Sequence, residues 1–361
     1  MRAPQARRRL FFSRPDGVTG ATLLRDLRRG DRRALARAIT LVESSRPDHR
    51  DKAERIIEAL LPETGKAVRI GISGPPGAGK STFIERFGLV GIALGRRIAV
   101  LAVDPASKRG GGAILGDKTR MAELTRAPEA FIRPSSAGGT AGGIARRTRE
   151  AILLCEAAGF DAILVETVGV GQAETAAAEI VDMFVLMLAP AGGDELQGIK
   201  RGIVELADLV LVNKADGELA PAAHRTVADY TSAMGLIRPP YPEWRVPVRA
   251  VSALKGTGIR EVWDDVDRFR AALRGTGTWA QRRAEQARAA LWSEIGDSLL
   301  DHFRAAPAVA QRLAALEEEV TAAIRTPTAA ARELLTLFVG EACESPVSRR
   351  HTGLTKGGPK A

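Results

Sequence analysis

Short apolar runs recur through the middle of the chain, and stretches with helical spacing of apolar residues lie between them. Runs of this kind predict strands of a parallel sheet covered on both faces, because a strand with one solvent-exposed face alternates apolar and polar residues. We therefore predict an α/β fold with a mainly parallel sheet, whose ligands bind beyond the carboxyl ends of the strands. The predicted strands are residues 67–72, 98–103, 131–133, 162–165, 183–188, 209–212 and 246–251.

Helical patterns precede and follow this predicted sheet. Before it, apolar spacing predicts two short helices within residues 20–45, with Asp31 as the N-cap of the second, and a third helix near residues 51–61. The long helix that follows the sheet carries an apolar stripe, which packs either on the sheet domain or on a second copy of the chain. The helices predicted after the sheet are residues 279–303, 307–324 and 327–339.

The composition limits the class of protein before any motif is considered. With 361 residues and 45% hydrophobic content, the chain is long enough for a core domain with additions. No apolar run approaches the roughly 20 residues of a membrane span, and the N-terminus lacks the apolar segment of a secretory signal. Cys155 and Cys343 form no metal-ligand pair and fit a reducing compartment, so we expect a cytoplasmic protein.

A net charge of +10 raises the question of a nucleic-acid partner. Aromatic residues make up only 4% of the chain and the arginines are interspersed with Glu and Asp, which argues against that partner. Solubility explains the charge better, with an acidic partner as the alternative. Five arginines within the first 14 residues would also suit an organelle transit peptide or a nucleic-acid tail, but a frayed basic leader is the simpler interpretation.

The strongest motif follows the first predicted strand. Residues 71–82 contain Gly74, four intervening residues and then Gly79-Lys80-Ser81, which is the spacing of a phosphate-binding loop. Backbone N–H groups of such a loop and the positive end of the following helix bind phosphate oxygens. Lys80 is expected to reach the terminal phosphates, and the Ser81 hydroxyl to bind Mg²⁺. The expected nucleotide-binding residues here are Gly74, Pro75, Pro76, Gly77, Ala78, Gly79, Lys80, Ser81 and Thr82.

Acidic residues near later strands complete the expected phosphate and magnesium site. Asp104 ends the second predicted strand, and Glu166 ends the strand at 162–165. A carboxylate there holds Mg²⁺ directly or through water, or orients a water for attack, and the residues alone leave these roles open. Gly169 would meet the terminal phosphate with its amide. Asp117 lies in a Gly-rich stretch that we predict to be a mobile, switch-like segment.

A second motif, Asn213-Lys214-Ala215-Asp216, follows the strand at 209–212. The Asp216 carboxylate can accept hydrogen bonds from N1 and the 2-amino group of guanine, and adenine offers neither donor in that place. Ser252, Ala253 and Leu254 follow the last predicted strand and would contact the same base through backbone amides. Each piece alone is common by chance, but their order in one alternating chain predicts a P-loop domain that binds GTP rather than ATP.

These residues resemble the MeaB/ArgK family of GTPases. The likeness lies in residues 71–82, 114–121, 166–172 and 213–216, and residues 30–40 match the family's helical lead-in. The resemblance extends from about residue 17 to residue 340. Members of that family are GTPase chaperones of cobalamin-dependent acyl-CoA mutases, above all methylmalonyl-CoA mutase, while isobutyryl-CoA and ethylmalonyl-CoA mutases use similar helpers.

The resemblance implies GTP, Mg²⁺, a homodimer formed through the C-terminal helices and a GTPase cycle coupled to a mutase. Hydrolysis would gate delivery of adenosylcobalamin and protect or reactivate the mutase. By position, Ser81, Asp104 and Glu166 resemble the family's magnesium-side residues. Asp117 resembles a residue of the first switch, and Lys200 resembles a cation tied to stimulated hydrolysis. The expected catalytic residues are therefore Lys80, Asp104, Asp117, Glu166 and Lys200.

The pattern and the resemblance together predict five parts of the chain. These are a disordered basic leader at 1–16, a helical extension at 17–66, a P-loop GTPase domain at 67–275, a helical dimerisation region at 276–340 and a disordered tail at 341–361.

Three other functions fit the pattern less well. A kinase or transport ATPase for basic amino acids needs an acceptor-substrate pocket, for which the chain has no motif. A metal-delivery GTPase for nickel enzymes is closer in fold, but the four histidines are far apart in the sequence. A membrane-targeting GTPase would carry a Met-rich module, whereas the five methionines are dispersed. We therefore expect a mutase as partner, and neither a nucleic acid nor a membrane.

Overall fold

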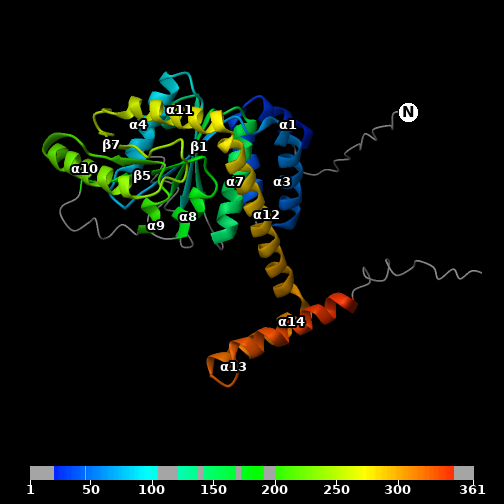
Figure 1. Ribbon diagram of the computed structural model, residues 1–361. Helices are drawn as coiled ribbons and strands as arrows, with labels where there is room; N and C mark the ends of the chain where they lie inside the picture. The colour runs from blue at the N-terminus through cyan, green and yellow to red at the C-terminus, as the bar shows by residue number, and fades with distance from the viewer. Residues whose placement is uncertain are drawn as a thin grey trace, which may run out of the picture. The chain divides into compact units, whose positions relative to one another are not determined.

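A computed structural model of the chain describes residues 20–44, 46–104, 121–136, 141–167, 172–190 and 201–344 (Figure 1). The chain forms two compact units, Met1–Arg288 and Ala289–Ala361, and each is described here by itself. The predicted leader at 1–16 and most of the predicted tail at 341–361 lie outside the described residues, and the predicted domain boundaries stay predictions.

The larger unit is built on a seven-stranded sheet in which all pairings are parallel, in the order β3-β2-β4-β1-β5-β6-β7. The predicted α/β fold is thus confirmed. One strand is longer than its apolar run, because β3 pairs with the whole of β2 and this pairing includes the polar residues Ser135 and Ser136. The strands are β1 (Val68–Ser73), β2 (Ile98–Asp104), β3 (Ala130–Ser136), β4 (Ala162–Thr167), β5 (Met183–Leu188), β6 (Leu209–Val212) and β7 (Val248–Ala250).

Helices cover both faces of this sheet (Figure 1). Helices α4, α6 and α11 pack on one face. On the other face α1, α2, α3 and α7 lie over the β3 side, and α10 lies over β5 and β6. The helices are α1 (Gly20–Arg28), α2 (Arg32–Glu43), α3 (Pro47–Leu60), α4 (Lys80–Ala93), α6 (Ala122–Arg126), α7 (Ala141–Ala157), α8 (Gln172–Ala178), α9 (Arg201–Val204), α10 (Ala220–Leu236) and α11 (Ile259–Thr276), with 3-10 turns at Leu61–Glu63 and Gly217–Leu219.

Helix α4, which follows the phosphate-loop motif, is held in place by Trp263 on α11. The indole stacks on Phe87 with ring centroids 4.1 Å apart, and its Nε1 donates to the Phe87 carbonyl at 2.9 Å. Gly91 makes room for this ring, since a Cβ at that position would lie 2.6 Å from it. The loop therefore leads into a helix whose position is fixed by buried aromatic packing.

The N-terminal helices belong to the same unit. Asp31 caps α2 as predicted, because its Oδ1 accepts a hydrogen bond from the Ala34 amide at 2.6 Å. The apolar side chains of Leu27 and Leu35 are fully buried in a cluster that includes residues of α7 and of β2. Glu43 at the end of α2 forms an ion pair with Arg133 of β3. The N-terminal helices thus cover the β2–β3 side of the sheet.

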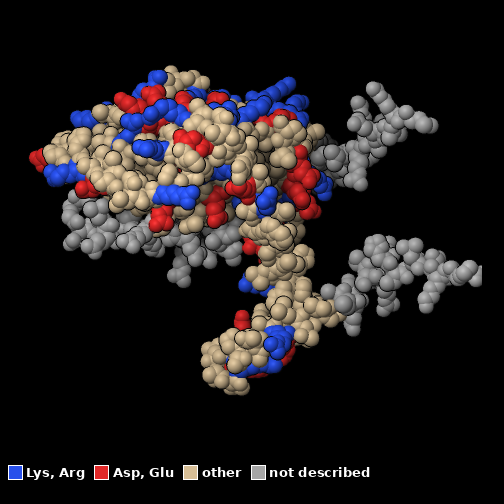
Figure 2. Space-filling model, in the orientation of Figure 1, with Lys and Arg blue, Asp and Glu red and all other residues tan. Residues whose placement is uncertain are grey.

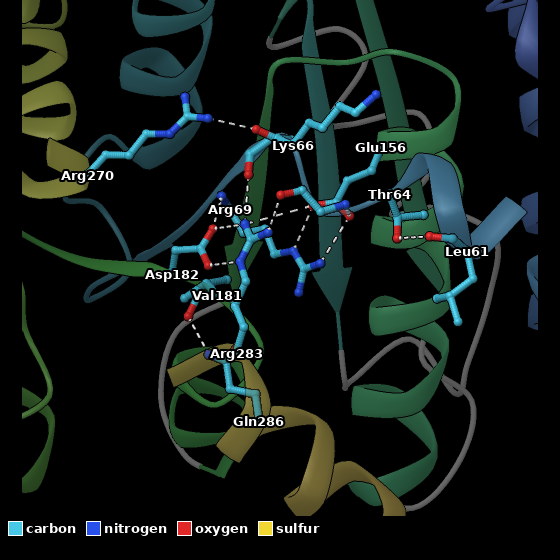
Figure 3. A network of polar contacts seen from close by, with 12 residues as sticks. Leu61, Thr64, Lys66, Arg69, Glu156, Val181, Asp182, Arg270, Arg283 and Gln286 are labelled. Carbon is cyan, nitrogen blue, oxygen red and sulfur yellow. Dashed lines mark hydrogen bonds and ion pairs between the residues drawn. The ribbon is translucent and has the colours of Figure 1, made fainter. Parts of the chain in front are cut away.

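A network of ion pairs closes the amino end of the sheet (Figure 3). Arg283, on helix α12 (Thr278–Ala305), donates to both carboxylate oxygens of Asp182 at 2.7 and 2.6 Å. The same guanidinium donates to the carbonyls of Gly65 and Ala67 at 2.7 Å each. Asp182 also accepts a hydrogen bond from the Arg69 amide at 2.8 Å. The start of α12 is therefore bound to the segment that enters β1 and to the residue that precedes β5.

The next strand is bound to α12 in a similar way. Asp208, which precedes β6 and is 1% exposed, lies 3.6 Å from the guanidinium of Arg282. Its Oδ2 accepts a hydrogen bond from the Phe184 amide at 2.8 Å. One turn further along α12, the side chain of Gln286 donates to the Val181 carbonyl at 2.7 Å. These contacts dock the first three turns of α12 against the amino ends of β5 and β6.

The smaller unit comprises the end of α12 with α13 (Pro307–Thr321) and α14 (Pro327–Glu344). Its core is small and is formed chiefly by Val309 and Leu316 of α13 with Leu334 of α14. Arg312 and Glu333 form an ion pair between these two helices at 2.9 Å. Across the described part of the chain, no helix has the length and apolar character that a membrane span requires. Large apolar side chains of this unit remain exposed at Leu291, Trp292, Ile295, Leu299, Leu300, Ile324, Leu335 and Val339.

The buried carboxyl of Asp208 generates a prediction about pH. Burial raises the pKa of Asp208 from 3.8 to about 6, and the charge of Arg282 only partly offsets this. The folded state binds this proton more tightly than the unfolded state does, so Asp208 lowers the stability as the pH rises from about 4 to 6. We expect Asp208→Asn to raise the free energy of unfolding, relative to the unchanged protein, by about 1–3 kcal/mol more at about pH 7.5 than at about pH 4. Urea unfolding of both proteins at the two pH values measures this difference, and parallel pH profiles would contradict it.

Candidate functional site

The loop between β1 and α4 depends on glycines at close approaches and at positive φ angles. At Gly74, with φ 149°, a Cβ would lie 2.0 Å from the carbonyl oxygen of Met187 on β5. Gly79 has φ 88°, and a Cβ there would lie 2.5 Å from the Asn213 amide nitrogen. Only glycine fits both places without displacing backbone or a buried amide. The loop is thus held close to β5 and to the residue that follows β6.

Lys80 is the first residue of α4 and turns back over the loop. Its Nζ donates to the carbonyl of Gly74 at 2.6 Å and to that of Pro75 at 3.2 Å. The ammonium therefore lies beside the loop and at the positive end of a helix, where an anion binds well. Phosphate oxygens brought to this place would find a cation, backbone N–H groups and a favourable dipole together.

Ser81 and Glu166 meet at the edge of this loop. The Ser81 hydroxyl donates to Oε1 of Glu166 at 2.9 Å, and Glu166 is only 6% exposed. Glu166 lies opposite Ile72 in the β1–β4 ladder, so the sheet itself brings it beside the loop. Hydroxyl and carboxylate oxygens are the hard donors that Mg²⁺ prefers, and this pair fits such an ion completed by phosphate oxygens and water. Among the residues that the structure describes, no group of three or more His, Cys, Asp and Glu could hold a metal ion alone.

Asn213 joins the phosphate loop to the loop after β7. Its Nδ2 donates to the carbonyl of Ala78 at 2.9 Å, and its Oδ1 accepts from the Ala253 amide at 3.0 Å. The side chain is 2% exposed, so both bonds form away from water. Buried amides that lose such partners cost about 1–3 kcal/mol each, which makes this bridge a strong constraint on the relative position of the two loops.

Asp216 is oriented by Ser252. The Ser252 hydroxyl donates to Oδ2 of Asp216 and accepts from the Lys255 amide at 3.0 Å. Lys214 adopts a positive φ of 59°, which turns the chain so that the Ala215 amide donates to the Val251 carbonyl at 3.0 Å. The carboxylate is only partly buried, whereas Ser252 is 1% exposed. This arrangement presents a fixed acceptor to donors such as N1–H and the 2-amino group of guanine.

The structure brings the described site residues together at the carboxyl ends of β1, β4, β6 and β7. Pro76, Gly77, Thr82 and Leu254 are exposed around this edge. Asp104 ends β2 beside β4, but only its backbone is described. The predicted roles of the individual side chains stay predictions. Asp117, Gly169 and Lys200 lie outside the described residues.

The hydroxyl of Ser252 is the part of the site that sequence reasoning missed. The motif assigned residues 252–254 to the base through backbone amides alone. Parallel pairing of β6 with β7 places Asp216 and Ser252 after neighbouring strand ends. A hydroxyl and a carboxylate that follow adjacent strands could therefore have been expected to meet.

Comparisons with known proteins show which family the chain resembles. The family model described as Methylmalonyl Co-A mutase-associated GTPase MeaB matches residues 35–308. The chain is 48% identical over 320 residues to the Methylmalonic aciduria type A homolog, mitochondrial, of Mus musculus, covering 86% of this chain and 77% of the relative. It is 46% identical over 290 residues to GTPase ArgK of Escherichia coli, covering 79% of this chain and 86% of the relative.

A solved structure is also similar. The protein named LAO/AO transport system kinase is 37% identical to this chain and superimposes with a TM-score of 0.72. The match covers 91% of this chain and 100% of that chain.

The position of Asp216 generates a prediction about nucleotide choice. Asp216→Asn replaces one acceptor by an amide that can donate to the 2-oxo group of xanthine. Each hydrogen bond to a charged group contributes about 1.5–3 kcal/mol, so the preference for GTP over XTP should fall by about a hundredfold or more. Titration of both nucleotides against the variant measures this, with Asp229→Asn on α10 as the control for lost charge. An unchanged GTP preference would contradict the assignment of Asp216.

Proposed function

Because the chain belongs to the MeaB family of GTPases, we propose that it hydrolyses GTP as the chaperone of a cobalamin-dependent acyl-CoA mutase. Methylmalonyl-CoA mutase is the partner that the family description indicates. In this role GTP hydrolysis gates the delivery of adenosylcobalamin and protects or reactivates the mutase. We place the protein in the cytoplasm, since its two cysteines fit a reducing compartment.

The observation that carries this proposal is the bridge made by Asn213 within a chain of this family. The bridge sets the phosphate loop at a defined distance from Asp216 and Ser252. A site built in this way can bind the phosphates and the guanine base of one nucleotide at the same time. The name of the similar structure, LAO/AO transport system kinase, suggests a kinase linked to transport, but a kinase or ATPase of this kind would have no use for an acceptor that faces guanine. A metal-delivery GTPase is a third candidate, and the mutase experiment below separates it from the first.

Different residues of the site have different roles in GTP hydrolysis. GTP and water give GDP and phosphate, and negative charge on the phosphate oxygens must be stabilised during the transfer. Lys80 supplies a positive charge beside the loop. Ser81, Asp104 and Glu166 would hold Mg²⁺, which neutralises charge on the terminal phosphates. Asp117 in the first switch and the amide of Gly169 complete the set. Each of the three acids could either bind Mg²⁺ or orient the attacking water.

Hydrolysis by the isolated protein should be slow. Gln172 lies three residues after Gly169 and not next to it as in a Ras-type Gly-Gln pair, and we assign no arginine finger within the chain. Such a group contributes about 10³–10⁵ in rate. Gly192 and Gly193 would let the loop before Lys200 move, and Lys200 is the cation that this loop would bring to the phosphates when the mutase binds.

We further propose a homodimer formed through the C-terminal helices. The smaller unit leaves Leu291, Trp292 and Leu299 exposed on α12, with 59%, 67% and 58% of each residue accessible. A cluster of large apolar side chains on one helix is typical of a surface that another copy covers. The second copy removes this surface from water.

Stimulation by the mutase is the direct test of the proposed function. We expect GTP hydrolysis to accelerate by about 10²-fold or more when methylmalonyl-CoA mutase is added, because the partner orders the catalytic loop. Lys200→Ala should retain GTP affinity and slow basal turnover but lose the acceleration. Lys66→Ala, which removes an exposed lysine near the amino end of β1, is the matched control.

Two results of this assay contradict different parts of the proposal. If the mutase leaves the rate of the unchanged protein unaltered, the chaperone function is wrong. If Lys200→Ala is accelerated as strongly as the unchanged protein, Lys200 is only a surface charge.

The dimer generates its own prediction. Leu291→Glu combined with Leu299→Glu places two carboxylates on the exposed stripe of α12, and burying unpaired charges strongly opposes association. Light scattering should report a dimer for the unchanged protein and a monomer for the variant, with GTP affinity kept within about threefold. A variant that remains dimeric would place the interface elsewhere.

A further inference from the structure

The positive charge of the chain is concentrated at its N-terminal end. Residues 1–37 contain 11 arginines, three aspartates and no lysine or glutamate, which is a net charge of +8 out of the +10 of the whole chain. The arginines are therefore not distributed as evenly as solubility alone would require. A strong asymmetry of this kind produces a local positive potential that attracts acidic partners.

Helices α1 and α2 and the turn between them carry six of these arginines, and three of the six are already engaged. Arg25 pairs with Asp26, and Arg28 pairs with Glu63 at 2.8 Å. Arg32 is half-buried and donates to the Ala127 carbonyl at 3.3 Å. Arg28 and Arg32 bind the N-terminal helices to other segments, and all three side chains would lose internal contacts on binding a partner.

The other three form an exposed set, which we call the arginine row. It consists of Arg29 in the turn after α1, and Arg33 and Arg37 on α2. Within the described residues, none of the three side chains has an ion pair or a hydrogen bond. Arg33 and Arg37 are four residues apart, so they project from the same face of α2 with a rise of about 6 Å. Like charges at this spacing destabilise a helix slightly, and the negative charge of an acidic partner would relieve this repulsion.

The arginine row lies away from the nucleotide site. Gly30, beside Arg29, packs against the side chain of Arg97, and Arg97 directly precedes β2. The turn is therefore at the amino end of the sheet, whereas the phosphate loop is at the carboxyl end. Lys and Arg side chains gather over α1 along the upper right edge of Figure 2. The row can thus bind a partner without competing with GTP.

We infer that the arginine row is a docking surface for an acidic face of the partner mutase. This inference rests on the proposed function, and it names the surface that brings the two proteins together. Arginine suits such a face, because its planar guanidinium binds carboxylates in a bidentate manner and is less strongly hydrated than an ammonium. Charges at the rim of an interface act mainly on the rate of association, which they raise at low salt.

A protein face fits this surface better than a phosphate polymer or a lipid surface does. Residues 20–44 contain no aromatic side chain, so bases would have nothing to stack on. The large apolar residues Leu27, Leu35 and Ile39 are fully buried and cannot insert into a lipid surface. Carboxylates of a folded partner need neither stacking nor insertion.

The test measures how fast the full chain and methylmalonyl-CoA mutase associate at several salt concentrations. Arg33→Glu combined with Arg37→Glu reverses two charges of the row, and the two Gln substitutions at these positions remove them. Both sites are exposed, and glutamate at position 33 lies in the first turn of α2, where a negative charge is favourable, so the variants should fold. Arg225→Glu combined with Arg238→Glu makes the same change of net charge at exposed positions in and just after α10.

At low salt the association rate should fall about tenfold or more for the Glu variant and less for the Gln variant. The α10 control should change it by less than about twofold, and the salt dependence should be weaker in the row variants only. Basal GTP hydrolysis and GTP affinity should be unchanged in all of them. Thermal unfolding should confirm equal stability.

Three outcomes overturn the inference, and they can be told apart. Equal association of the row variants and the α10 control leaves the mutase partnership standing but removes the arginine row from it. Binding of duplex DNA or of anionic vesicles as tightly as the mutase, lost in the row variants, assigns the surface to a phosphate-bearing partner. If the unchanged protein neither binds the mutase nor is stimulated by it, the proposed function fails first and the inference fails with it.

Discussion

The buried side chain of Asn213 is the constraint on which the nucleotide site depends. It holds the phosphate loop by the Ala78 carbonyl and the loop after β7 by the Ala253 amide. Since both partners are backbone groups, the bridge sets the distance between two loops whatever side chains they carry. Parallel pairing supplies the rest of the arrangement, because it brings the ends of β1, β4, β6 and β7 to one edge. The chemistry of the site then follows from which residues stand after each strand.

Charged side chains help to hold the opposite end of the sheet. Arg283 with Asp182, and Arg282 with Asp208, dock α12 to the amino ends of β5 and β6. Buried ion pairs are costly to desolvate and add little net stability, but they tolerate only one geometry. Their effect here is to fix the first turns of α12 within the larger unit. The nucleotide site and the start of α12 are thus joined to opposite ends of the same strands.

The sequence predicts those features that depend on local patterns. The apolar runs predict the parallel sheet, the spacing from Gly74 to Ser81 predicts the phosphate loop, and Asp31 is recognisable as a cap. Contacts between distant residues could not be predicted in this way. Arg283 and Asp182 are 101 residues apart, and no periodicity pairs them. Ser252 and Asp216 are 36 residues apart and meet only because β6 and β7 are neighbours.

For the arginine row, too, the sequence predicts one part and the structure supplies the rest. The excess of arginine is visible in the sequence, but the sequence does not tell which side chains are engaged. Arg28 and Arg32 have internal partners, while Arg33 and Arg37 have none within the described residues. Charge at the amino end of the sheet and GTP at its carboxyl end would let one molecule bind a partner and hydrolyse its nucleotide independently. Coupling between the two would then come from the loop that contains Lys200.

Transfer of adenosylcobalamin to the apo mutase tests the central claim most directly. Absorbance changes would follow loading of the mutase in the presence of this protein with GTP, with a non-hydrolysable GTP analogue or without nucleotide. If hydrolysis gates delivery, loading should proceed with GTP and be held back with the analogue, and this difference should vanish when the protein is omitted. Equal loading with GTP, with the analogue and without nucleotide would contradict the account.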